Sequence, residues 1–328
     1  MAKSELLKKL DKIIGDDSGR FRSITWWADT GCDLINWMIH PDGHGIPGGR
    51  VTEIYGKNSS GKTALALHVC RWVQKQGGKA FYLDLEPGLS KEWAQKIGVN
   101  TDEMWTDTPG SLEQALACVE AIVDDRLDAV EPTVIVFDSL AAVGTEAALD
   151  RNTVKDATPI GDVARLMSGW LRNKGIPRKI RDTKIIFLIL NQTREKVGVM
   201  FGNPETTPGG QAVPFAAWLR LRVERKSDIK PSTGPVLGYF CEVKVIKNKV
   251  EKPGQKVSFP MYWGFGIDNC MALLLYCQNE KIVPAEGSSI VWNGVKTTKR
   301  KMRDGMLADR ELLEEVREVV KRHIKSNW

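Results

Sequence analysis

The chain has 328 residues and a formal net charge of +6, with 42% hydrophobic and 27% charged residues. This is the composition of an ordinary globular protein that can bury a large core, and the length suggests one large domain with a smaller one. No stretch is long enough to span a membrane, and the six scattered cysteines form no CxxC pair, so we expect reduced thiols in a cytosolic protein. The positive charge favours a polyanionic partner only weakly, because excess lysine is commonly a solvated face.

The N-terminal residues predict a short amphipathic helix. Their apolar side chains recur at helical spacing and lack the continuous apolar run of a signal peptide: Leu6, Leu7, Leu10, Ile13 and Ile14. Residues 30–49 follow, with the glycine and proline punctuation of turns around a short helix. His40 and His44 lie in this segment at a spacing that suits a metal site. Because no third ligand accompanies them, we expect no metal site there.

From residue 50 onward, apolar runs typical of strands alternate with helical segments. We expect strands at residues 50–56, 79–86, 133–140 and 184–192, and helices at 63–76, 90–98, 111–125 and 161–173. Strands this apolar are buried on both faces, which favours a mostly parallel sheet covered by helices on both sides.

Three more strand-like runs follow, at residues 218–226, 238–250 and 255–263. Short polar turns join them, which suits antiparallel pairing at one edge of the sheet. From about Asp268 the composition shifts to short helices and a basic stretch, and the chain ends in a charged helix. This shift predicts a small C-terminal domain.

The segment GKNSSGKT is the strongest motif in the chain. It matches GxxxxGK[ST] and lies between a predicted strand and a predicted helix, as a P-loop requires. Lys62 would reach the β- and γ-phosphates of a nucleotide, and Thr63 would hold Mg²⁺. The rest of the loop would face phosphate oxygens with its backbone N–H groups; these residues are Gly56, Lys57, Asn58, Ser59, Ser60 and Gly61.

Two carboxylates at predicted strand ends complete a candidate ATP and Mg²⁺ site. Asp138 ends the strand TVIVF, the position from which a carboxylate reaches the metal shell of a P-loop enzyme. Glu86 ends the strand that follows the P-loop helix and is our candidate for polarising the attacking water. Asp84, two residues earlier, is the rival for that role.

The chain resembles the bacterial RecA family of recombinases in six segments that occur in family order: VTEIYGKNSSGKT, FYLDLE, VIVFDSLAA, ARLMS, NQTREKVGVMFGNPETTPGG and VIKNKVEKPGQ. The resemblance runs from about Thr30 to Asp268. It implies a RecA-type α/β ATPase core at residues 30–268, an N-terminal helix and linker for subunit packing at 1–29, and a small C-terminal α+β domain with a basic tail at 269–328. It also implies a filament on DNA with ATP held between neighbouring subunits.

The resemblance assigns roles within the nucleotide site. Glu86 matches the family's water-activating glutamate, Asp138 its Walker B aspartate, and Gln192 the glutamine that senses the γ-phosphate. Trp93 stands where the family stacks a tyrosine on adenine, and an indole can do the same.

Two lysines carry the implied contact between subunits. Lys247 and Lys249 match lysines that reach the neighbouring subunit's γ-phosphate, in the manner of an arginine finger. Their spacing alone would place them on one strand face, which is usually solvated.

The resemblance also places DNA along two loops, at residues 144–162 and 193–210. The matching residues are Ile160, Arg165, Ser168, Arg172, Arg194, Lys196, Val197, Gly209 and Gly210. The arginines would contact phosphates, and the glycines allow close approach of their N–H groups to phosphates. Ile160 and Val197 fall where the family inserts apolar side chains between bases.

These inferences predict a DNA-dependent ATPase that forms filaments on single-stranded DNA and exchanges strands with homologous double-stranded DNA. Two alternatives stay open: a hexameric RecA-fold helicase, and a nucleotide-gated protein that only coats single-stranded DNA or mediates loading. The chain departs from the bacterial pattern in its longer first loop and in Pro214, just before Phe215. Its short N-terminus, basic tail and eleven tryptophans favour a phage-encoded member.

Overall fold

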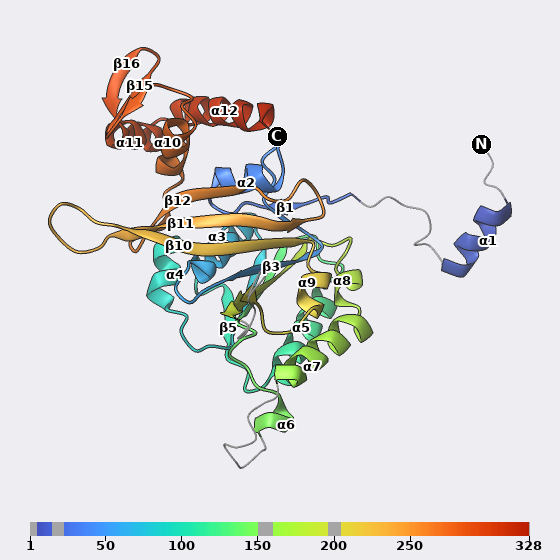
Figure 1. The fold of residues 1–328 in the computed structure, drawn as a ribbon. Coiled ribbons are helices and arrows are strands. Elements are labelled where there is room, and N and C mark those ends of the chain that lie inside the picture. Colours follow the sequence, from blue (N-terminus) through green and yellow to red (C-terminus); the bar gives the residue numbers. More distant parts are fainter. Residues whose placement is uncertain (1–4, 15–22, 150–159, 196–204, 328) are drawn as a thin grey trace.

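A nine-stranded sheet forms the centre of the protein, seen in a computed structural model that describes residues 5–14, 23–149, 160–195 and 205–327 (Figure 1). The strand order is β13-β12-β11-β10-β3-β7-β6-β4-β5. The strands are β3 (Arg50–Gly56), β4 (Lys79–Asp84), β5 (Met104–Asp107), β6 (Thr133–Asp138), β7 (Ile185–Gln192), β10 (Leu219–Ile229), β11 (Gly238–Asn248), β12 (Lys256–Tyr262) and β13 (Gly266–Ile267).

The strands from β10 to β5 pair in parallel, and the central strands β3, β6 and β7 are buried on both faces. Alternate residues of one strand enter opposite cores: on β7, Leu188 belongs to one core cluster and Phe187 to the other. This alternation confirms the predicted parallel sheet with two covered faces.

Helices cover the two faces of the sheet. They are α2 (Asp33–Ile39), α3 (Lys62–Lys75), α4 (Lys91–Ile97), α5 (Leu112–Arg126), α7 (Ile160–Asn173), α8 (Ile176–Lys179) and α9 (Ala212–Ala216). The short helix α6 (Glu146–Leu149) lies away from the sheet, at the lower end of the molecule in Figure 1. Residues of α2 and α3 pack into one core, and residues of α5 and α7 into the other. Serine caps start two of the helices: Ser90 accepts the N–H of Trp93, and Ser111 that of Gln114.

The edges of the sheet show one confirmed and one missed prediction. β10, β11, β12 and β13 pair antiparallel at one edge, as expected. The opposite edge carries β5, which the sequence analysis did not predict. β5 is short, and only Met104 of its four residues is buried, so it has no apolar alternation to reveal it. Two small sheets lie beside the main one, β1 (Trp27–Ala28) with β2 (Ile46–Pro47) and β8 (Arg194–Glu195) with β9 (Glu205–Thr206).

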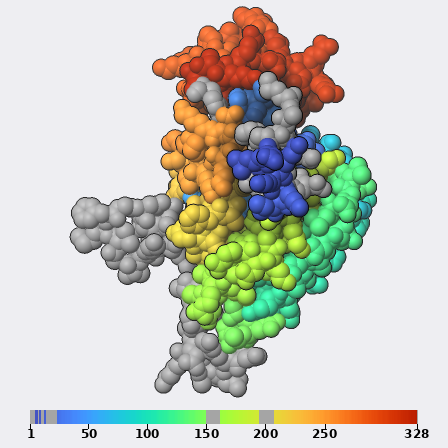
Figure 2. All heavy atoms as spheres, turned by 90° about the vertical axis from the view of Figure 1, so that its right-hand side faces the viewer, coloured from blue at the N-terminus to red at the C-terminus, as the bar shows by residue number. Residues whose placement is uncertain are grey.

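The C-terminal segment lies at one end of the molecule, in orange to red in Figure 2. It contains α10 (Asn269–Asn279), β14 (Ala285–Glu286), β15 (Ser289–Trp292), β16 (Val295–Thr298), α11 (Lys299–Ala308) and α12 (Arg310–Ser326). The basic stretch at residues 295–303 is divided between β16 and α11. Apolar residues of this segment, among them Trp292 and Val320, join the core cluster that also contains α2 and α3.

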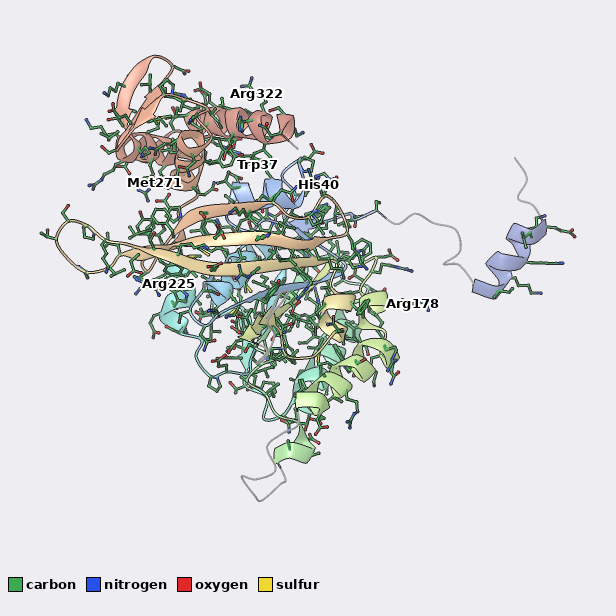
Figure 3. The ribbon with its side chains drawn as sticks, in the orientation of Figure 1. Trp37, His40, Arg178, Arg225, Met271 and Arg322 are labelled. Carbon is green, nitrogen blue, oxygen red and sulfur yellow. The ribbon has the colours of Figure 1, made fainter. Side chains whose placement is uncertain are left out.

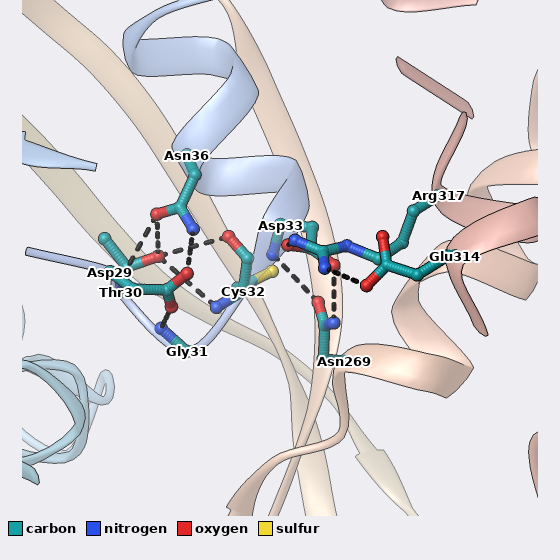
Figure 4. A network of polar contacts seen from close by, with 9 residues as sticks. All are labelled: Asp29, Thr30, Gly31, Cys32, Asp33, Asn36, Asn269, Glu314 and Arg317. Atoms are coloured by element: carbon teal, nitrogen blue, oxygen red, sulfur yellow. Dashed lines mark hydrogen bonds and ion pairs between the residues drawn. The ribbon is translucent and has the colours of Figure 1, made fainter. Parts of the chain in front are cut away.

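A polar network joins α12 to the core (Figure 4). Arg317 donates to the Asp33 carboxylate at 2.7 Å, and Asn269 donates to the other oxygen of that carboxylate at 2.7 Å. The N–H of Asp33 donates in turn to the Asn269 side chain at 2.8 Å. Next to this network, burial raises the pKa of the Asp29 carboxyl. The position of α12 is therefore fixed by directional bonds as well as by apolar packing.

Helix α1 (Glu5–Ile14) lies away from the sheet in Figure 1. Its side chains at Leu6 and Ile13 are 64% and 79% exposed. All six cysteines are free thiols, and five of them are buried. Among the described helices, none is both long and apolar enough to cross a membrane.

Candidate nucleotide-binding site and DNA loops

The P-loop joins β3 to α3, so the predicted strand, loop and helix are all present. Two positions fix its path. Gly61 has a φ of +109°, a conformation that suits glycine. A Cβ on Gly56 would lie 2.0 Å from the backbone oxygen of Val223, so this residue must be glycine for β10 to pass beside it. Ser60 is buried inside the loop.

Lys62, Thr63 and Asp138 come together at the start of α3. The Thr63 hydroxyl donates to a carboxylate oxygen of Asp138 at 2.9 Å, and Tyr82 donates to the same oxygen. The Lys62 ammonium donates to the backbone oxygen of Lys57 at 2.9 Å. A hydroxyl beside a carboxylate offers the hard oxygen ligands that Mg²⁺ prefers, so this pair fits the metal of a nucleotide complex.

Burial sets the electrostatics of this site. It raises the pKa of the Asp138 carboxyl, and it lowers the pKa of the Lys62 ammonium. The charged form of each group is therefore less stable here than it would be in water. A phosphate chain beside Lys62 and a cation beside Asp138 would relieve both costs.

Glu86 and Gln192 meet at the ends of two strands. Gln192, the last residue of β7, donates its side-chain N–H to the Glu86 carboxylate at 2.6 Å. Ser139 donates to the same carboxylate at 3.2 Å. β4 ends at Asp84, two residues before the predicted end, so Glu86 lies in the turn after the strand. The rival Asp84 accepts the N–H groups of residues 88 and 89, at 3.1 and 3.0 Å, and so closes this turn.

Trp93 lines a cavity of about 180 Å³ next to the P-loop. Two aromatic residues that the sequence analysis did not single out complete its wall, Tyr239 and Trp263. The Trp263 ring lies 6.4 Å from that of Trp93 and 5.1 Å from that of Tyr239. The Arg225 guanidinium lies 4.7 Å from the Tyr239 ring. These rings form a surface on which a flat base can stack.

Lys247 and Lys249 lie at the end of β11 and just after it, close to the exposed Phe215. The Lys247 ammonium donates to the backbone oxygens of Pro214 and Phe215 at 2.6 and 3.2 Å. The Lys249 ammonium lies 5.4 Å from the Trp218 ring. Burial, together with the charge of Lys249, lowers the pKa of Lys247. Both lysines therefore lie close to Phe215, and the Lys247 ammonium makes its hydrogen bonds within the same chain.

The DNA candidates of the first loop lie on α7. Arg165 and Arg172 are exposed, and Ser168 between them is partly buried. Arg165 pairs with Asp162 at 3.5 Å. Ile160 is the first residue of α7. The two arginines are seven residues apart on one helix and share a face, as predicted.

The second loop begins and ends in ordered structure. Arg194 pairs with Thr206 across β8 and β9, so the two sides of the loop form a short hairpin. Asn191 donates to the backbone oxygen of Pro208 at 3.0 Å. Gly209 and Gly210 have φ values of +85° and +62°. The candidates Lys196 and Val197 lie outside the described residues.

A buried ion pair lies beneath this loop. Glu53 is fully buried on β3, and Arg220 on β10 donates to it at 2.5 Å. Asn191 donates to the other oxygen of Glu53 at 3.1 Å. The carboxylate therefore receives one bond from β7 and one from β10, and it fixes Asn191 beside Gln192.

A P-loop between a parallel strand and a helix, with a carboxylate at the end of β6, defines a P-loop nucleotide-binding protein of the α/β class. The family model for the RecA N-terminal domain matches residues 30–268. The chain therefore belongs to the RecA family, as the sequence motifs indicated.

Individual relatives agree with this family. The chain is 41% identical over 250 residues to Protein RecA of Enterococcus gallinarum, a match that spans 76% of this chain and 69% of the relative. It is 43% identical over 244 residues to Protein RecA of Lactiplantibacillus pentosus, covering 74% of this chain and 62% of the relative. It is also similar in structure to the RadB recombinase, with a TM-score of 0.50 and 20% identity over 73% of this chain and 97% of that one. At that identity the structural match supports the fold alone.

Proposed function

We propose that this protein is a DNA-dependent ATPase that assembles on single-stranded DNA and exchanges strands with homologous double-stranded DNA, in recombination and repair. ATP and Mg²⁺ bind at the P-loop, Thr63 and Asp138. Glu86 orients the attacking water, and Trp93 stacks on the base. The proposed location is the cytoplasm, as for a bacterial RecA. The relatives at 41–43% identity, each named Protein RecA, support this proposal.

One observation carries the proposal: the 2.6 Å bond between Gln192 and Glu86. Glu86 is the candidate that would activate water, and Gln192 is the last residue before the second DNA loop. A γ-phosphate that recruits Gln192 would therefore change both the environment of Glu86 and the start of the loop. A single side chain would couple ATP to DNA.

The subunit contact is proposed from exposed features. Phe215 is 76% exposed, and Lys247 and Lys249 lie beside it. α1 carries exposed apolar side chains and would pack on a neighbouring subunit. For Lys247 to reach a neighbour's γ-phosphate, it must release the carbonyls of Pro214 and Phe215, so assembly exchanges an internal contact for one between subunits. The proposed division is residues 1–29 for packing, 30–268 for catalysis and DNA, and 269–328 as a small C-terminal domain.

The test measures ATP hydrolysis with and without single-stranded DNA, together with strand exchange. We expect DNA to stimulate hydrolysis, and Glu86→Gln to lower the rate by about 10²- to 10⁴-fold while ATP still binds. Gln192→Met should keep ATP binding and abolish the stimulation by DNA. Gln74→Met is the matched control, because within the described part of the chain the Gln74 amide makes its hydrogen bonds with the Asn100 backbone and none with the second loop.

Other outcomes separate the alternatives. Closed rings and unwinding of duplex DNA would support the helicase. Absence of strand exchange in the wild type, with coating of single-stranded DNA that is unchanged in Glu86→Gln, would support a passive coat. A wild-type rate of ATP hydrolysis that is the same with and without single-stranded DNA would contradict the proposal itself. DNA affinity should fall steeply with salt, because the proposed contacts are mainly to phosphates.

A further inference from the structure

The turn between α2 and β2 gathers three metal-ligating side chains. His40, Asp42 and His44 each offer one ligand atom, and the three atoms lie within 4.8 Å of one another. The sequence analysis found no third ligand for the two histidines, and this was wrong. The turn at residues 41–42 folds back and brings the Asp42 carboxylate to within 4.0 Å of His40 Nδ1.

Aromatic stacking holds this cluster in place. The Trp27 and His44 rings are stacked, with centroids 5.0 Å apart and an angle of 14°. The rings of His40 and His44 lie 4.6 Å apart. Below them, Asn248 at the end of β11 donates to the backbone oxygen of Ile39 at 2.8 Å. Both histidines lie in the connection between α2 and β2, and these contacts restrict the positions of their rings.

His40 presents the lone pair of its Nδ1 atom toward Asp42. His40 Nδ1 accepts the N–H of Asp42 at 3.1 Å, so the ring proton lies on Nε2. His40 Nε2 lies 3.9 Å from a carboxylate oxygen of Glu251. A metal ion at Nδ1 would replace the Asp42 N–H and keep the same tautomer. Glu251 would then orient the ring, as carboxylates commonly do for metal-bound histidines.

We propose that His40, Asp42 and His44 form a binding site for a divalent transition-metal ion of the zinc class, with Glu251 orienting His40 and solvent as the fourth ligand. Two imidazoles and one carboxylate suit such an ion better than Mg²⁺ or Ca²⁺, which prefer oxygen. Metal bonds of about 2.0–2.1 Å place tetrahedral ligands about 3.3 Å apart. The three ligand atoms now lie within 4.8 Å of one another, so metal binding would draw them together, and the Asp42 side chain, 57% exposed, is free to rotate.

The site would compete with the C-terminal helix. Lys325 near the end of α12 donates to the Asp42 carboxylate at 2.6 Å. Figure 3 shows His40 below α12, where the core and the C-terminal segment meet. A cation cannot share this carboxylate with Lys325 without repulsion, so metal binding displaces the lysine. Removing Lys325 should therefore strengthen metal binding, an effect that a purely structural turn would not produce.

The experiment titrates Co²⁺ into the untagged full-length chain without nucleotide, follows its visible absorption, and then displaces it with Zn²⁺. We expect one tetrahedral ion per chain. His44→Gln and Asp42→Asn should each weaken binding by at least about tenfold, and Glu251→Gln by about tenfold. Lys325→Met should strengthen it about two- to fivefold, the span of one exposed ion pair.

The control is His323→Gln on α12. His323 also has a carboxylate nearby, at 3.8 Å in Glu280, but it belongs to no three-ligand group within the described residues. Its loss should leave the titration unchanged. Because His44 also stacks on Trp27, Asp42→Asn tests the ligand set without disturbing the stack. Wild-type protein without stoichiometric binding, or Asp42→Asn with wild-type affinity, would overturn the proposal.

Discussion

Replacing Arg220 by methionine should lower the free energy of unfolding more than the loss of an exposed ion pair does. The substitution removes the ion-pair partner of Glu53, which is fully buried, and among the described residues it leaves the Asn191 amide to donate to that carboxylate. Loss of one partner from a buried ion pair typically costs about 3–5 kcal/mol, because an uncompensated charge stays in the core.

Replacing Glu53, the other partner of the pair, should lower the free energy of unfolding by less. Glu53→Gln removes the negative charge from the core. The Arg220 side chain is 16% exposed, so its guanidinium can rotate toward solvent and be hydrated there. The expected loss is one charge-assisted hydrogen bond, about 1.5–3 kcal/mol. In the double variant no buried charge is left, so its cost should be below the sum of the single costs, with a coupling energy of about 2 kcal/mol.

Urea unfolding followed by tryptophan fluorescence measures these free energies. The control is Lys179→Met, whose ion pair with Asp124 is also short, at 2.6 Å, but exposed on both sides. It should cost less than about 1 kcal/mol. The reasoning fails if Arg220→Met costs no more than Lys179→Met, since the two pairs differ chiefly in burial.

Three further outcomes follow from the nucleotide site. Asp138→Asn should be more stable than wild type without nucleotide, because burial raises the pKa of Asp138 and its charged form therefore opposes folding. In urea unfolding, the advantage of the variant should be absent below about pH 3.8, grow as the pH rises from there to the raised pKa, and stay constant above it. Trp263→Ala should weaken ATP binding about tenfold by calorimetry, whereas Trp105→Ala on β5 should not. Gly56→Ala should cost about 3 kcal/mol in thermal unfolding, whereas Gly161→Ala, where an added Cβ meets no described residue within 4 Å, should be neutral.

The part of the site that was predictable from sequence lies on the parallel strands. Their apolar runs fix where β3, β6 and β7 end, and parallel strands bring these ends to one edge of the sheet. The P-loop, Asp138 and Gln192 therefore fall close together, as the motifs indicated. Tyr239 and Trp263 were missed because Tyr239 lies on the antiparallel strand β11 and Trp263 directly follows β12, and no local pattern reveals that this edge of the sheet lies next to the P-loop.

Short-range backbone geometry accounts for the other differences. Asp42 joins the two histidines only because a tight turn reverses the chain between them, and ligand spacing in the sequence does not reveal such a turn. β8 and β9 are two residues each, too short for any periodicity to predict. Elements of this kind depend on what the rest of the fold holds in place.

Asn191 and Gln192 show how these features combine under the proposed function. They are neighbours at the end of β7, yet their side chains bind different parts of the molecule. Gln192 contacts Glu86 in the candidate hydrolysis site, whereas Asn191 contacts both Glu53 and the far end of the second loop at Pro208. The Glu53 carboxylate holds Asn191 in a fixed position. If Gln192 moved toward a γ-phosphate while Asn191 stayed in place, the first residues of the second loop would move relative to its last residues. Weakening that anchor with Glu53→Gln should therefore reduce the effect of ATP on DNA affinity while leaving ATP binding intact.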